Sequence, residues 1–109
     1  MTIYKAPFEQ FAVSLDFSAD VGPGNSIASI TSVTATSNLT GLDSTDDVIA
    51  VTPAPAIGSS GTAVTFTVAG QVTDGASGGV VGERHTISVQ IVSSIGEKYQ
   101  GDITLEIVA

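Results

Sequence analysis

The feature that most restricts the fold is a pair of strongly alternating segments near the end of the chain. Residues 85–93 and 101–108 each alternate between apolar and polar side chains, and residues 94–97 join them. The alternate positions that form one side of these segments are, in chain order, His85, Ile87, Val89, Ile91, Ile103, Leu105 and Ile107. A period of two residues is typical of strands with one buried face and one solvated face. These segments therefore predict a β-hairpin that covers a hydrophobic core.

The rest of the chain repeats this pattern and shows no sustained helical spacing. Strands are predicted at residues 11–17, 27–36, 48–52 and 63–68, and Gly22-Pro23-Gly24-Asn25 is a strong turn signal between two of them. A change of parity inside residues 27–36 predicts a β-bulge or a twist in the middle of this strand. Pro53 and Pro55 place residues 52–57 at a sheet edge or in a loop, because proline has no N–H for a central ladder. Six or seven short strands predict an all-β, immunoglobulin-like antiparallel β-sandwich.

The predicted sandwich domain covers residues 11–109, and a chain of 109 residues accommodates one such domain. Its core is expected to contain Phe11, Val13, Leu15, Val33, Val64, Phe66, Ile87, Val89, Ile91, Leu105 and Ile107. Residues 1–10 precede the first alternating segment. They are predicted to form an N-terminal arm, which lies either against a neighbouring molecule or against the edge of the domain itself.

Two segments are candidates for contact with a partner protein, the N-terminal arm and the glycine-rich loop at residues 71–82. Among their apolar residues, the candidate contacts are Tyr4, Pro7, Phe8, Val72, Val80 and Val81. Binding residues concentrate on loops that a rigid scaffold holds in place. These six residues are therefore predicted partner contacts, and the alternative for the valines is packing on the rim of the sandwich.

Composition argues against several classes of partner. The chain has three Lys and Arg residues against eleven Asp and Glu residues, a net charge of −8. Nucleic acid and anionic membrane surfaces are not expected partners, because both attract basic proteins. Cysteine is absent, so disulfides and thiolate metal sites are excluded. No apolar run approaches the roughly 18–20 residues of a membrane span. The first residues lack the profile of a signal peptide, which predicts synthesis in a cytoplasm.

No residue pattern predicts catalysis or a cofactor. His85 is the single histidine, and its place at the end of a predicted strand favours a structural role over metal binding or acid–base chemistry. Asp43, Asp46 and Asp47 form the densest acidic cluster. They lack the spacing of a calcium loop, which favours a solvated turn and leaves cation binding open. Because nucleophile and phosphate-loop motifs are also missing, the chain is predicted not to be an enzyme.

Several segments together resemble a known family. They are Lys5-Ala6-Pro7 with Glu9, then residues 14–18, 26–34, 65–70, 86–94 with Gly96, and 101–107. From about Lys5 to Val108, the chain is similar to the fiber–tail adaptor proteins of tailed phages, which are small immunoglobulin-like virion proteins.

The resemblance implies a structural protein of a phage virion that joins or decorates larger parts. Its partners would be other virion proteins, its location the assembled particle after synthesis in the bacterial host, and its state there oligomeric. A capsid cement or decoration protein is the alternative. A free bacterial immunoglobulin-like adhesion or carbohydrate-binding module has less support, because tryptophan is absent and no export signal is seen.

Overall fold

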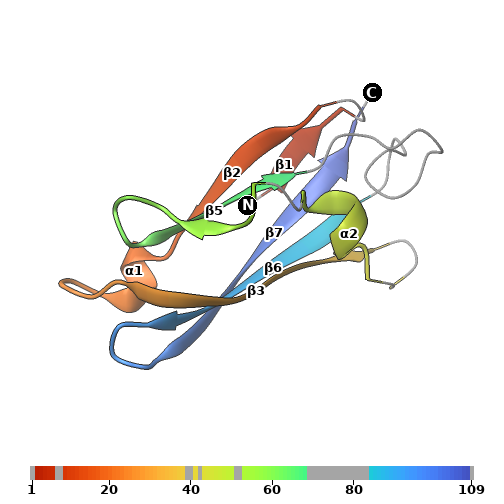
Figure 1. Ribbon diagram of the computed structural model, residues 1–109. Helices are drawn as coiled ribbons and strands as arrows, with labels where there is room; N and C mark the ends of the chain where they lie inside the picture. The colour runs from red at the N-terminus through yellow and green to blue at the C-terminus, as the bar shows by residue number, and fades with distance from the viewer. Residues whose placement is uncertain are drawn as a thin grey trace.

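The computed structural model describes residues 2–6, 9–38, 41, 43–50, 53–68 and 84–108. Within them, the elements in chain order are β1 (Thr2–Lys5), β2 (Phe11–Asp16), α1 (Ser18–Val21), β3 (Ile27–Ser37), α2 (Thr45–Val48), β4 (Ala56–Ile57), β5 (Ala63–Val68), β6 (Arg84–Ser93) and β7 (Lys98–Ile107). The strands form two sheets that pack together (Figure 1). The predicted all-β sandwich is therefore confirmed.

The order of the strands is that of an immunoglobulin-like sandwich. A four-stranded sheet has the order β1-β7-β6-β3, and a three-stranded sheet has the order β2-β5-β4. In immunoglobulin constant domains, strands B, E and D face strands C, F and G. The same positions are taken here by β2, β5 and β4 in one sheet and by β3, β6 and β7 in the other, while β1 extends the second sheet beside β7.

The first strand lies along the edge of the domain itself, one of the two positions expected for the N-terminal segment. Thr2–Lys5 runs parallel to β7, and Lys5 lies opposite Ile107. The backbone N–H of Val108 donates to the carbonyl oxygen of Lys5 at 2.8 Å. Ile3 packs against the core and Lys5 is fully buried. Since alternate residues of a strand point to opposite faces, both side chains point into the sandwich, so this segment is part of the domain and lies along its own sheet edge.

The core agrees with the alternation in the sequence. Eight of the predicted residues are buried, and Phe11, Leu15 and Val33 are half-buried and pack against them. The buried apolar residues that complete the core are Phe17, Val21, Ile27, Ala35, Val48, Ile49, Val68 and Ile103. All of these except Val21 lie within the predicted strand segments, and Val21 and Val48 lie in the two helical turns.

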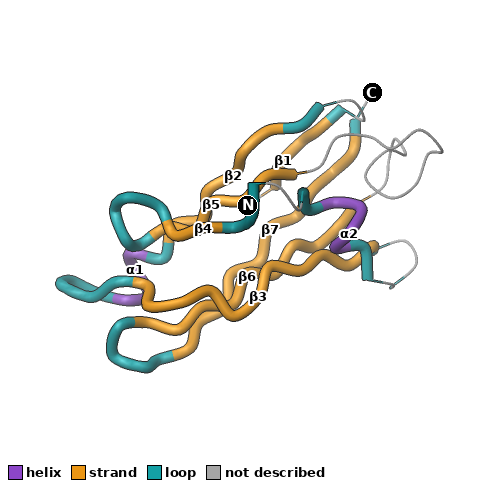
Figure 2. The backbone as a smooth tube through the Cα atoms, in the orientation of Figure 1, coloured by secondary structure: helices purple, strands orange, loops and turns teal. Residues whose placement is uncertain are grey.

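Irregular segments differ more from the prediction. The predicted bulge is confirmed, because the register of β3 shifts between Ile27 and Ser29 and again between Ile30 and Ser32. The predicted strand at residues 48–52 is wrong at its start, where α2 ends at Val48 and Ile49 forms an isolated bridge. Residues 51 and 52 lie outside the described residues. The two helical turns lie at opposite ends of the sandwich (Figure 2).

A close approach between the sheets depends on one glycine. Gly101 lies in β7 opposite Val89, on the inward parity. A Cβ atom at this position would lie 2.7 Å from Leu15 Cδ2 and 3.2 Å from Phe17 Cζ. Side chains of the facing sheet therefore fill the space that a larger residue would need.

Candidate interaction surface

The largest regular surface among the described residues is the outer face of the four-stranded sheet. Its side chains are the outward residues of β1, β3, β6 and β7, which are exposed or half-buried. We call this surface the outer face. Because the backbone ladder fixes the strands, the positions of these side chains follow from the register of the sheet.

The register arranges the outer face in rows that run across the strands. Thr36 of β3 lies opposite Thr86 of β6, Thr86 opposite Thr104 of β7, and Thr104 opposite Thr2 of β1. One row of four threonines thus crosses all four strands. The neighbouring row contains Thr34, Ser88 and Asp102, the next contains Ser32, Gln90 and Gln100, and on the other side Arg84, Glu106 and Tyr4 form a row.

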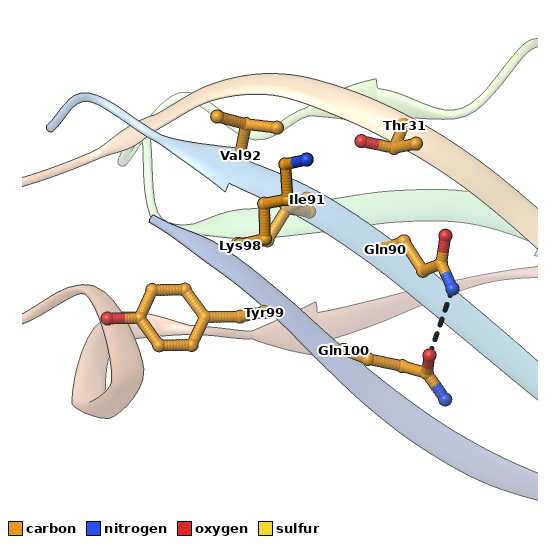
Figure 3. Close-up of a pocket in the computed structure, with 7 residues that line it drawn as sticks. All are labelled: Thr31, Gln90, Ile91, Val92, Lys98, Tyr99 and Gln100. Atoms are coloured by element: carbon orange, nitrogen blue, oxygen red, sulfur yellow. Dashed lines mark hydrogen bonds between the residues drawn. The ribbon is translucent and has the colours of Figure 1, made fainter. Parts of the chain in front are cut away.

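Hydrogen bonds join the amide row into a chain. Ser32 Oγ donates to Gln90 Oε1 at 3.3 Å, and Gln90 Nε2 donates to Gln100 Oε1 at 2.9 Å. Gln100 Nε2 in turn donates to Asp102 Oδ1 at 3.1 Å. Figure 3 shows the Gln90 and Gln100 amides side by side on β6 and β7. The network holds planar polar groups in fixed positions across the sheet.

A shallow hollow of about 510 Å³ lies beside this row, toward the turn that joins β6 and β7. Its lining is Thr31, Gln90, Ile91, Val92, Lys98, Tyr99 and Gln100. Thr31 falls at the second register shift of β3, between residues that pair with β6. Desolvation, followed by a hydrogen bond to Glu97, raises the pKa of Tyr99. Tyr99 also packs against the core, so this residue both lines the hollow and contributes to the packing of the core.

The charges of the outer face balance one another. Arg84 and Lys98 are its basic residues, and Asp102 and Glu106 are its acidic residues. Arg84 Nε donates to Glu106 Oε1 at 2.6 Å. The rest of the chain, with Lys5 against nine acidic residues, carries the whole net charge of −8. The outer face is therefore a neutral, hydroxyl-rich surface on an acidic protein.

His85 has a structural environment. The side chain is fully buried at the start of β6, and Nδ1 forms a 2.8 Å hydrogen bond with Ser44 Oγ. The backbone N–H of Ser44 donates to the carbonyl oxygen of Ala35 in β3 at 2.8 Å. These contacts tether the segment before α2 to the four-stranded sheet, in agreement with the structural role predicted for this histidine.

The acidic cluster contributes to a local turn. The hydroxyl and backbone N–H of Thr45 both donate to the carboxylate of Asp43, and these bonds, the hydroxyl first, lower the pKa of Asp43. The fully described residues include no group of three or more acidic or histidine side chains that could hold a metal ion. The side chains of Asp46 and Asp47 lie outside that description.

One of the six predicted contact residues can be placed. Tyr4 lies on the outward parity of β1, beside Glu106, and is 61% exposed. It therefore stands at the edge of the outer face. The other five, Pro7, Phe8, Val72, Val80 and Val81, lie outside the described residues. The outer face itself was missed by the sequence analysis, and the signal that was available is the polar parity of the alternating strands.

No protein-family model matches the sequence, and no curated protein matches it closely. No helix of the described chain is long and apolar enough to cross a membrane.

Proposed function

We propose that this chain is a non-enzymatic structural protein of a tailed-phage virion, of the fiber–tail adaptor type, which joins or decorates larger parts of the particle. The observation that carries the proposal is the outer face, a broad array of hydroxyl and amide side chains on a rigid sheet with no net charge. The resemblance of the alternating segments to the adaptor family supports the same assignment.

A surface of this kind suits contact with another protein. Hydroxyl and amide groups both donate and accept hydrogen bonds, so they suit contact with another polar protein surface. Their positions are set by backbone pairing rather than by loops, which lowers the entropy lost when a partner binds. Tyr4 adds an exposed aromatic ring at the edge, and tyrosine is enriched where proteins meet. No step of this role needs a cofactor.

The direct test is whether the protein is present in particles. Genes for portal, capsid or tail proteins beside the coding gene, and peptides of this chain in mass spectra of purified virions, are the expected results. Absence of the chain from virions that otherwise contain all their structural proteins would refute the assignment.

A matched pair of variants tests the surface within that assignment. Tyr4→Ala removes an exposed ring at the edge of the outer face, and Ile95→Ala removes an exposed apolar side chain that is 60% exposed, in the turn after β6. In particles that lack the natural gene and are supplied with each variant, Tyr4→Ala should reduce incorporation, whereas Ile95→Ala should not. Equal incorporation of the two variants would argue against contact through this edge.

A further inference from the structure

We infer that the outer face is a self-association surface, on which a second copy of this chain docks face to face about a two-fold axis parallel to the strands. The inference goes beyond the proposed virion role and does not depend on it, because it concerns the purified chain alone. It rests on the charge balance of the face, its row pattern and its size.

The distribution of charge favours this face for contact between identical copies. Two chains with a net charge of −8 repel one another. Both basic residues of the chain other than buried Lys5, namely Arg84 and Lys98, lie on the outer face. With Asp102 and Glu106 they give it no net charge, so two copies that meet here avoid most of the repulsion.

The rows are self-complementary. A two-fold axis that runs between β6 and β7, parallel to both, places β6 of each copy over β7 of the other and keeps every row in line. In the central rows, Thr86 then faces Thr104 of the second copy, and Ser88 faces Asp102 of the second copy. The hydroxyl of Ser88 is a suitable donor for that carboxylate.

The outer rows fit the same axis. Gln90 faces Gln100 of the second copy, so an amide meets an amide, and Arg84 faces Glu106 of the second copy. Two packed sheets normally cross at about 30°, which displaces the outer rows by a few ångströms. Long side chains such as arginine, glutamate and glutamine span that displacement.

The size of the face predicts a weak and reversible dimer. The strands of the sheet contain 4, 11, 10 and 10 residues. At about 4.8 Å between strands and about 3.4 Å per residue, they cover about 570 Å² on each copy, or about 1,100 Å² in total. This area lies at the lower end of specific interfaces, where transient complexes are found.

Sedimentation velocity of the purified full chain tests the inference. Concentrations run from about 10 µM to about 1 mM, the range in which a weak, transient complex passes from monomer to dimer. The expected result is a monomer that converts to a dimer as the concentration rises. A chain that stays monomeric at about 1 mM overturns the inference.

Opposite charge changes at one position identify the surface. Ser88→Glu places a carboxylate against Asp102 of the second copy and should weaken the dimer at least tenfold. Ser88→Lys places an ammonium group there and should tighten it. Since Ser88 is on the outward parity of β6, both variants should keep the β-rich circular dichroism spectrum. Ser88 also lies opposite Asp102 of its own chain, so Ser88→Glu should lower the melting temperature slightly and Ser88→Lys should not.

The controls carry the same charge changes on the opposite side of the sandwich. Ala12 is exposed on the outward parity of β2, and Ala12→Glu and Ala12→Lys alter the net charge as the Ser88 variants do. Their dissociation constants should stay within about twofold of the natural value. Equal effects at Ala12 and Ser88 would show that net charge alone governs association, and would overturn the inference. Failure of this test leaves the virion proposal standing, because particle incorporation is measured independently.

Discussion

Replacing Gly101 with valine should destabilise the protein through the contact between the two sheets. The Cβ atom alone would lie 2.7 Å from Leu15 Cδ2 and 3.2 Å from Phe17 Cζ, and the γ-methyl groups of valine reach further. Phe17 is 1% exposed and cannot move into solvent. Overpacking of a core costs about 1–3 kcal/mol. Removing glycine from a strand returns about 0.5–1 kcal/mol, so the expected net loss is centred on about 1 kcal/mol, within a range of about 0–2.5 kcal/mol.

Urea denaturation measures this loss as a lower midpoint at an unchanged m-value. The matched control is Gly58→Ala, because Gly58 has no positive φ and the nearest atom to an added Cβ is 3.6 Å away. That variant should change the free energy of unfolding by no more than about 1 kcal/mol, and toward higher stability, as for glycine replaced without strain.

A double-mutant cycle isolates the contact. Leu15 is half-buried, and Leu15→Ala removes the methyl group that lies nearest to the new side chain. The double variant Gly101→Val with Leu15→Ala should therefore lose less stability than the sum of the two single losses, by at least about 0.5 kcal/mol. Additive losses, or a more stable Gly101→Val variant, would refute the argument that this glycine sets the approach of the sheets.

The remaining predictions concern the core and the first strand. Phe66→Ala removes a ring that is 1% exposed and should lower the free energy of unfolding by about 3–5 kcal/mol in urea titrations; a loss below about 1 kcal/mol would contradict the assigned core. Deleting residues 1–5 removes β1 and the burial of Ile3, and should cost about 1–3 kcal/mol, whereas a free arm would leave the melting temperature unchanged. Burial lowers the pKa of Lys5 below its usual 10.5, so on approach to pH 10.5 the unfolded chain binds more protons than the folded chain, and stability rises with pH. Between neutral pH and pH 10.5, the free energy of unfolding of the natural chain should therefore rise relative to that of Lys5→Met. Parallel pH profiles of the two chains would show that the pKa of Lys5 is not lowered.

The alternation in the sequence was sufficient to predict the main strands and most of the core residues. In β6 and β7, each inward residue is apolar except His85, Ser93 and Gly101, so the pattern of burial follows directly from the period of two. The parity change in β3 similarly predicted its register shifts. In these segments the local pattern and the tertiary contacts demand the same conformation.

The first strand could not be recognised in this way. It has four residues, and the inward position that follows Ile3 is Lys5, a residue type that is almost never fully buried. Its partner β7 lies about a hundred residues later in the chain, as the pairing of Thr2 with Thr104 shows. A parallel pairing of that separation leaves no local signal.

The outer face could not be recognised from the sequence for a similar reason. Its central row unites residues 2, 36, 86 and 104, which are remote from one another until the register is known. The turn α2 has no strong helical sequence and depends on tertiary bonds from Ser44 to Ala35 and His85. Both features come from long-range contacts, which a single sequence does not reveal.

The pairing of β1 with β7 also determines how the protein responds to tension. These are the first and last strands in chain order, and they run side by side in the same direction. A pull between the beginning of β1 and the end of β7 slides the strands past one another along their axes. All the hydrogen bonds between them then bear the load together, whereas a hairpin opened from its ends loses them one at a time. Forced unfolding is governed by the unfolding rate, and loading the hydrogen bonds between β1 and β7 together lowers that rate.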